Sequence, residues 1–133
     1  MHWNIKNKYV MSGISLERVV FDTNALIYFM GGDKRLKIFE TSAVYISVFS
    51  EIETKGRFGI TKAELKSINE IIEDFTIIPF NDEIKEISIQ LRHTNKLKLP
   101  DSLIAATSIW IGFPFVTADR DFKNISELNM LLI

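Results

Sequence analysis

Four acidic residues have the type and position needed for metal-assisted chemistry: Asp22, Glu53, Asp101 and Asp119. Each follows a short apolar run or falls early in an expected helix, and three of them have no basic neighbour in the sequence. Carboxylates that a fold brings together repel one another, and a divalent cation relieves that repulsion. Oxygen ligands without histidine or cysteine select hard cations, so the pattern predicts a Mg²⁺ site, with Mn²⁺ as the alternative. Such an ion activates water and offsets charge on a phosphate, which favours phosphodiester hydrolysis.

Each acid also has a simpler structural explanation. Asp22 suits a helix N-cap, and Glu53 suits the third position of a capping box that Ser50 opens. Asp101 complements a helix dipole, and Asp119 suits the cap of a short turn. Four such residues at one expected edge of a sheet favour a shared site. Neighbouring polar residues are expected to orient waters or carboxylates there: Thr23, Asn24, Thr117 and Asp121.

Size and composition set the outer bounds. The chain has 133 residues, of which 47% are hydrophobic, and this predicts one domain with a packed core. The lack of cysteine excludes disulfides, thiolate zinc sites and a cysteine nucleophile. Neither of the two histidines, His2 and His93, lies near a nucleophile motif. The net charge of −1 gives no overall attraction to nucleic acid. No apolar run approaches the roughly 18 residues of a membrane span, and the N-terminus lacks a signal-peptide pattern, so we expect a cytoplasmic protein.

Short apolar runs alternate with helical patterns across residues 16–133. The runs predict five strands, at 19–21, 43–46, 75–80, 115–116 and 130–133. Amphipathic spacing and capping residues predict helices between them, at 25–30, 34–40, from 50 to about 56, 61–74, 81–96 and 100–111, with a helical turn at 119–124. This alternation predicts an α/β fold with a parallel sheet covered on both faces. Residues 1–15 lack the pattern and are expected to form an N-terminal extension.

The expected topology gathers the four acids. Ligands bind beyond the carboxyl ends of the strands in open parallel sheets. Asp22 follows the first strand directly, and Glu53 lies one turn into the helix after the second strand. Asp119 follows the fourth strand, and Asp101 opens the helix that leads into it. One edge of the sheet therefore receives all four carboxylates.

Four segments resemble the acidic motifs of PIN-domain ribonucleases, in the same order along the chain. They are Val-Phe-Asp-Thr-Asn-Ala-Leu-Ile at 20–27, Ile-Ser-Val-Phe-Ser-Glu-Ile-Glu at 46–53, Leu-Pro-Asp-Ser-Leu-Ile-Ala-Ala at 99–106 and Phe-Val-Thr-Ala-Asp-Arg-Asp-Phe at 115–122. Any one motif is weak, but the ordered set, which spans residues 17–125, is specific. The small size resembles the VapC-type toxins of bacterial VapBC toxin–antitoxin pairs.

The resemblance implies a PIN-like three-layer fold, with a central parallel five-stranded sheet flanked by helices. It also implies an endoribonuclease that depends on Mg²⁺ or Mn²⁺. Asp22, Glu53 and Asp101 would be the core metal-binding acids, and Asp119 would complete the site. The implied partners are an RNA substrate, a cognate antitoxin protein that reaches the active site, and a second copy of the chain in a homodimer.

Two departures from the family pattern leave the second acidic ligand open. Glu53 falls three residues after Ser50, as the motif prefers, but Glu51 is close enough to be an alternative. The family usually has an apolar residue after this glutamate, whereas Thr54 follows here.

RNA binding needs basic residues that meet phosphates. The candidates fall in three groups, and Lys96 and Lys98 are favoured because they flank the loop that leads to Asp101. The full set is Lys34, Arg35, Lys37, Lys55, Arg57, Arg92, Lys96 and Lys98.

Aromatic residues near the fourth strand invite a base-stacking role. Their apolar setting instead predicts core packing for Trp110, Phe113 and Phe115. His93 falls on the polar side of its helix and is expected at the surface.

Other functions remain open. A PIN-like domain can be a catalytically silent module that binds RNA or protein. A phosphotransfer domain of the haloacid dehalogenase type would use Asp22 as its nucleophile, but that chemistry expects a second aspartate where Asn24 stands. A receiver-like domain expects an acidic pair before the first strand aspartate, and this chain lacks it.

Overall fold

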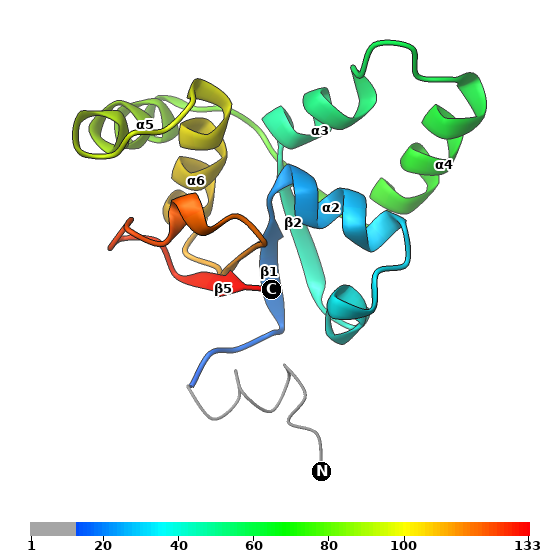
Figure 1. The fold of residues 1–133 in the computed structure, drawn as a ribbon, viewed down its shortest axis with the longest axis horizontal. Helices are drawn as coiled ribbons and strands as arrows, with labels where there is room; N and C mark the ends of the chain where they lie inside the picture. Colours follow the sequence, from blue (N-terminus) through cyan, green and yellow to red (C-terminus); the bar gives the residue numbers. More distant parts are fainter. Residues whose placement is uncertain (1–12) are drawn as a thin grey trace.

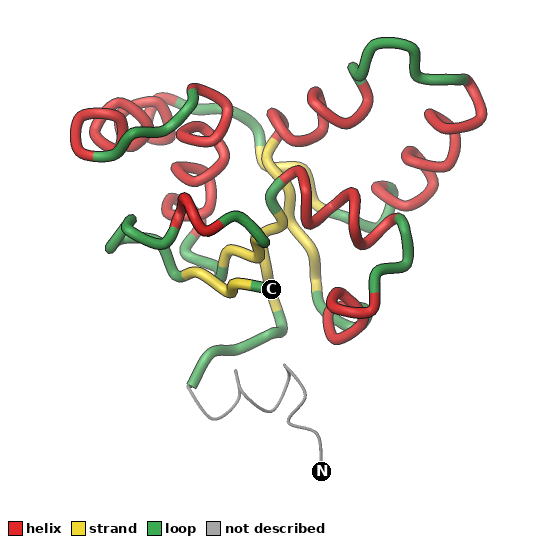
Figure 2. The backbone as a smooth tube through the Cα atoms, viewed as in Figure 1, coloured by secondary structure: helices red, strands yellow, loops and turns green. Residues whose placement is uncertain are grey.

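A parallel five-stranded sheet forms the centre of the molecule, in a computed structural model that describes residues 13–133. The strand order is β3-β2-β1-β4-β5. Figures 1 and 2 show strands at the centre of the molecule, with helices on either side. The strands are β1 Arg18–Phe21, β2 Ala43–Ser47, β3 Thr76–Ile78, β4 Phe115–Thr117 and β5 Met130–Leu132. The predicted α/β fold with a five-stranded parallel sheet is confirmed.

The helices connect consecutive strands and cover both faces of the sheet. They are α2 Thr23–Met30, η1 Lys34–Phe39, α3 Val48–Lys55, α4 Lys62–Ile72, α5 Asp82–Thr94, α6 Leu99–Ile111 and η2 Arg120–Phe122. In Figure 1, α5 and α6 lie on one side of the sheet, and α2 and α4 lie on the other. Because helices shield both faces, the strands are apolar without a polar side.

Strand β1 lies at the centre of the sheet and contributes to both halves of the core. Val19 and Phe21 pack against α2, η1 and α4, whereas Val20 packs against α5 and α6. All three side chains are fully buried. The alternation follows from strand geometry, in which successive side chains point to opposite faces. The ring of Phe21 contacts three other aromatic rings, those of Phe29, Phe39 and Phe75.

The order of the strands creates a switch point between β1 and β4. From β1 the chain proceeds outward to β2 and β3, and it then returns to the other side of β1 to form β4 and β5. Phe21 pairs with Val116, so both strands end at the same level of the sheet. Open α/β sheets bind ligands at the carboxyl ends of strands beside such a switch point. Helix α3 contacts both α2 and α6 near this edge.

Several predicted boundaries differ from the observed ones. The N-cap of α3 lies three residues earlier than predicted, because Ser47, and not Ser50, accepts a hydrogen bond from the amide of Phe49. The predicted strand at 75–80 is reduced to β3, and the helix at 34–40 is a 3-10 helix. Thr61 and Asn81, the first residues of the predicted helices at 61–74 and 81–96, are the N-caps of α4 and α5.

The predicted N-terminal extension falls almost entirely outside the described residues, which include only 13–15 of it. Within residues 13–133, no helix is both long enough and apolar enough to cross a membrane.

Candidate active site

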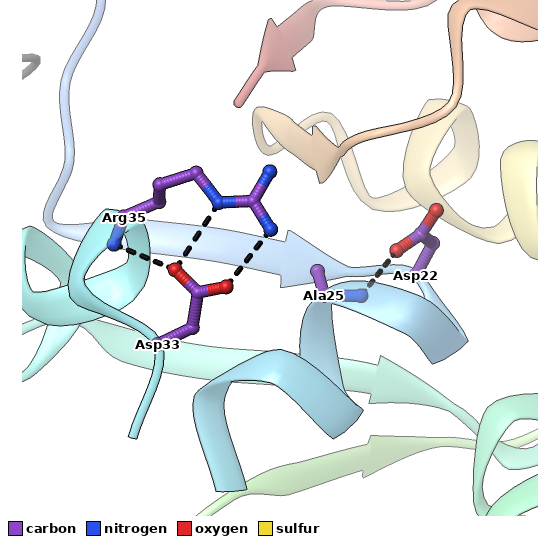
Figure 3. Close-up of polar contacts among 4 residues, drawn as sticks. All are labelled: Asp22, Ala25, Asp33 and Arg35. Atoms are coloured by element: carbon purple, nitrogen blue, oxygen red, sulfur yellow. Dashed lines mark hydrogen bonds and ion pairs between the residues drawn. The ribbon is translucent and has the colours of Figure 1, made fainter. Parts of the chain in front are cut away.

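Asp22 lies at the switch point, immediately after β1, and is 5% exposed. One carboxylate oxygen, Oδ1, accepts a hydrogen bond from the amide of Ala25 at 2.7 Å and so caps α2 (Figure 3). Burial raises the pKa of the Asp22 carboxyl above its usual value of 3.8, and the hydrogen bonds from Thr117 and Ala25 oppose this rise. The negative charges of Asp119 and Asp101 raise the pKa further. Asp22 is therefore both a helix cap and a member of an acidic group.

Thr117, the last residue of β4, links two of the predicted acids. Its hydroxyl donates to Oδ2 of Asp22 at 2.5 Å and accepts a hydrogen bond from the amide of Asp119 at 3.0 Å. The side chain of Thr117 is fully buried, so these bonds do not compete with bulk water. Asp119 in turn caps η2, because its Oδ1 accepts from the amide of Asp121 at 2.8 Å. Asp121 is exposed at the rim.

Asp101 approaches the same edge from the first turn of α6. It is half-buried, and burial raises the pKa of its carboxyl above 3.8. The charges of Asp119, Glu53 and Asp121 raise this pKa as well, whereas Lys98 lowers it. Four elements of the fold thus bring like charges within electrostatic reach.

Glu53 lies on α3 and is exposed, but its carboxylate is bound to the neighbouring helix α2. Oε1 of Glu53 accepts a hydrogen bond from the hydroxyl of Thr23 at 2.7 Å. Glu51 points elsewhere, and its Oε2 lies 2.7 Å from Nζ of Lys55. The geometry therefore associates Glu53, rather than Glu51, with the other acids.

The four acids share one edge, but they do not form a closed cage. Among residues 13–133, no group of three or more acidic or histidine side chains is arranged to hold a metal ion as it stands. Asn24 is exposed in the first turn of α2 beside this edge. The polar residues predicted around the site thus divide into two kinds, since Thr23 and Thr117 bind carboxylates directly while Asn24 and Asp121 face solvent.

Comparison with known proteins identifies the family. A model of the PIN domain matches residues 19–128, which is most of the chain. The chain belongs to the PIN-domain family. Its fold is similar to that of a toxin–antitoxin complex from Klebsiella pneumoniae, with 30% sequence identity and a TM-score of 0.72, over 83% of this chain and 94% of that chain.

Other solved structures resemble this PIN domain in fold. One is VapBC2 from Rickettsia felis bound to a DNA fragment from its promoter, with 18% identity and a TM-score of 0.77, over 87% of this chain and 98% of that chain. Another is VapBC-5 from Mycobacterium tuberculosis, with 18% identity and a TM-score of 0.67, over 88% of this chain and 99% of that chain. No curated protein matches significantly. The resemblance to PIN domains, stated from the motifs, is confirmed at the level of family and fold.

Three of the eight basic residues of the PIN domain that were considered for RNA binding are paired with carboxylates outside the four acids. Arg35 forms two side-chain hydrogen bonds with Asp33, away from Asp22 (Figure 3). Lys55 pairs with Glu51, and Arg57 pairs with Glu64. Lys98 is the basic residue whose charge acts on Asp101.

The three aromatic residues near β4 that were considered for base stacking have different environments. Phe115 is fully buried, as predicted, and Phe113 is half-buried with its ring 4.9 Å from that of Tyr45. The prediction for Trp110 is wrong. This side chain is 40% exposed at the end of α6, and its indole N–H donates to Oε2 of Glu83 at 2.8 Å. The exposed position of His93 is confirmed.

Sequence reasoning missed one residue of the site. Ser50 is fully buried, and its hydroxyl oxygen lies 3.1 Å from that of Thr23. Ser50 was interpreted as a helix cap because the spacing to Glu53 fits a capping box. The earlier start of α3 was not predicted because Val48 and Phe49 are apolar and continue the apolar pattern of β2.

Proposed function

We propose that this PIN domain is an endoribonuclease that hydrolyses phosphodiester bonds with Mg²⁺, or with Mn²⁺ in its place. The observation that carries the proposal is the position of the four acids at the carboxyl edge of the sheet, beside the switch point. In agreement with that position, burial and the negative charge of Asp119 raise the pKa values of both Asp22 and Asp101. Maintaining several carboxylates there costs stability, and a divalent cation would recover it.

The donor set fits a hard divalent cation. All four proposed ligands supply carboxylate oxygens, and neither sulfur nor imidazole is present among them. Mg²⁺ retains several waters and usually takes only one or two protein carboxylates, so a preformed cage of three acids is not required. When bound, the ion supplies a Lewis acid that activates water and offsets charge on the phosphate. We propose that Asp22, Glu53, Asp101 and Asp119 would hold it together, some directly and the others through the waters that the ion retains.

The residues around the acids have separate tasks in this proposal. The Ala25 amide and the Thr117 hydroxyl hold the Asp22 carboxylate in one orientation. Thr23 does the same for Glu53. Asn24 and Asp121 are exposed at the rim, where they would orient water. Lys98 lies near Asp101 and would meet a phosphate of the bound RNA, with Lys96 beside it in the same loop.

We further propose that the protein is the toxin of a toxin–antitoxin pair and acts in the cytoplasm as a homodimer. Its similarity to a protein of the Klebsiella pneumoniae toxin–antitoxin complex supports an antitoxin partner. A groove of about 420 Å³ between α2, α3 and α4 supports it as well. Glu53 lines this groove together with four apolar side chains, those of Ile27, Met30, Ile68 and Ile71. An antitoxin segment bound there would therefore reach the acidic edge.

Cleavage of a mixture of structured and single-stranded RNA tests the proposal. Wild-type protein should cleave with Mg²⁺ or Mn²⁺ and should stop when a chelator is added. Asp22→Asn and Asp101→Asn should each lower the rate by more than about 100-fold, because even the outer partners of metal ligands usually contribute 10- to 100-fold. Asp74→Asn is the matched control, since this exposed aspartate lies in the turn before β3, at the opposite edge of the sheet. Normal cleavage by Asp22→Asn would remove Asp22 from the catalytic site.

The same experiment separates the competing functions. A wild-type protein that binds Mn²⁺ and RNA but does not cleave any RNA would be a catalytically silent binding module. A phosphotransfer role for Asp22 is the weaker alternative, because that chemistry expects a second aspartate where Asn24 stands.

A further inference from the structure

Two hydroxyl-bearing residues and one carboxylate form a connected group between α2 and α3. The Thr23 Oγ1 lies 2.7 Å from Glu53 Oε1 and 3.1 Å from Ser50 Oγ. Ser50 is fully buried, while Glu53 is exposed. Thr54 belongs to the same helix, but its hydroxyl donates to the backbone carbonyl of Ser50 at 2.7 Å and does not reach the acid.

Counting protons fixes the direction of these hydrogen bonds. An ionised carboxylate only accepts, and a hydroxyl has one proton to donate. Thr23 must therefore give its proton to Glu53, which is also its shorter contact. The Thr23 oxygen is then left as an acceptor, and the hydroxyl of Ser50 supplies the donor. The bonds run in one direction, from Ser50 to Thr23 to Glu53, and each polarises the next.

These two hydrogen bonds restrict the orientation of the Glu53 side chain, which is otherwise free to rotate. An exposed glutamate has several free rotamers, and the negative charge of Asp101 favours those that point away from the acidic edge. A lysine or arginine anchor would hold the carboxylate but would also neutralise part of the charge that attracts a cation. A neutral hydroxyl holds one oxygen and leaves the charge and the second oxygen available.

We infer that Ser50 is a positioning residue, which orients Glu53 for cation binding by fixing the hydroxyl of Thr23. Ser50 itself is buried in the contact between α2 and α3 and does not touch substrate or cation. The inference rests on the proposed function in taking Glu53 as a ligand. It also explains the serine at a position three residues before that glutamate, where the helix needs no cap.

Manganese binding to the purified protein, without RNA, provides the first test. Ser50→Ala should weaken Mn²⁺ binding by about tenfold, the lower end of the effect expected for outer partners of metal ligands. Thr23→Val should weaken it at least as much, and Thr23→Ser should restore it because the hydroxyl remains. Thr54→Val is the matched control, since it deletes another buried hydroxyl of α3 and should leave affinity unchanged. Equal affinities of Ser50→Ala and wild type would overturn the inference, as would equal losses in Ser50→Ala and Thr54→Val.

A thermodynamic cycle in the metal-free protein tests the link without any assumption about catalysis. Urea midpoints are measured for Ser50→Ala, Glu53→Ala and the double variant. If Ser50 acts through Thr23 on Glu53, the double variant should lose less than the sum of the single losses. Additive losses would show that the two residues are independent and would refute the inference. Coupling in a protein that cleaves no RNA would leave the inference standing and would refute only the proposed function.

Discussion

Thr117→Val is the most informative single substitution, because it removes one buried hydroxyl that serves two of the acids. Valine has the same branched shape, so the packing between β1 and β4 is retained. The hydroxyl donates to Oδ2 of Asp22 at 2.5 Å and accepts from the amide of Asp119 at 3.0 Å. Both groups lose a partner in a place where the threonine is fully buried.

The size of the effect follows from the two bonds. A hydrogen bond to a charged group contributes about 1.5–3 kcal/mol, and one between neutral groups contributes about 1 kcal/mol. Thr117→Val should therefore lower the free energy of unfolding by about 2–4 kcal/mol at neutral pH. This is a large part of the 5–15 kcal/mol typical of a domain, so the transition should shift clearly.

The pH dependence of this loss has a definite sign. The bond from Thr117 stabilises the ionised form of Asp22 and lowers its pKa, so it opposes the rise that burial causes. The part of the loss that arises from the charge should be complete above the pKa of Asp22 in the variant, which is higher than in wild type because the bond is missing. It should shrink as the pH falls from there through the wild-type pKa, which lies above 3.8.

Urea unfolding of Thr117→Val at neutral and at acidic pH measures both effects. Thr107→Val is the matched control, because Thr107 is also buried but its hydroxyl donates to the carbonyl of Leu103 within α6. The control should lose about 1 kcal/mol, with little change between the two pH values. If the two variants lost equal free energy, or if the loss in Thr117→Val did not depend on pH, the argument for a charge-assisted bond would be refuted.

Three further outcomes follow from the structure. Ser47→Ala should lower the free energy of unfolding by about 1 kcal/mol, because it removes the N-cap of α3, and urea unfolding against wild type measures the loss. Gly112→Ala should cost about 1–2 kcal/mol by the same assay, since Gly112 ends α6 with a φ of 81°. The folded pKa of Asp101 is raised, so its contribution to stability is greatest below pH 3.8 and falls as the pH rises through the folded pKa. Asp101→Asn should therefore stabilise the metal-free protein at neutral pH, with no gain at acidic pH, and Mn²⁺ should raise the melting temperature of wild type more than that of the variant.

Much of the fold could be predicted because its strongest signals are local. Val19, Val20 and Phe21 form an uninterrupted apolar run, as a strand covered on both faces requires. The prediction of where α3 begins was wrong for a local reason. Strand β2 passes into the helix without a loop, and Ser47 is both the last strand residue and the N-cap. The prediction that Trp110 is buried was wrong because its environment depends on a contact that is distant in sequence. An apolar helix end indicates burial, but only the folded chain shows that Glu83 lies beside an exposed indole.

The candidate site could be predicted in outline and not in its contacts. Parallel strands end at one edge, so acids that follow them must lie near one another. The partners of those acids are distant in sequence, however. Thr117 is 95 residues from Asp22, and Thr23 is 30 residues from Glu53. The choice between Glu51 and Glu53 likewise depends on a neighbouring helix, because two residues two apart project from different sides of α3.

The supporting residues explain how an acidic edge can persist in a small domain. Neutral groups hold Asp22 and Glu53, namely an amide and the hydroxyls of Thr117 and Thr23. Three basic side chains are bound to carboxylates outside this group: Arg35, Lys55 and Arg57. Neutral donors fix geometry without removing charge, so the repulsion remains as a cost to the metal-free fold. At the proposed cation site, that cost would favour a small divalent ion, because such an ion would recover more free energy from clustered carboxylates than a monovalent ion would. A variant that placed a lysine at Thr23 would stabilise the fold and should lose cation binding for the same reason.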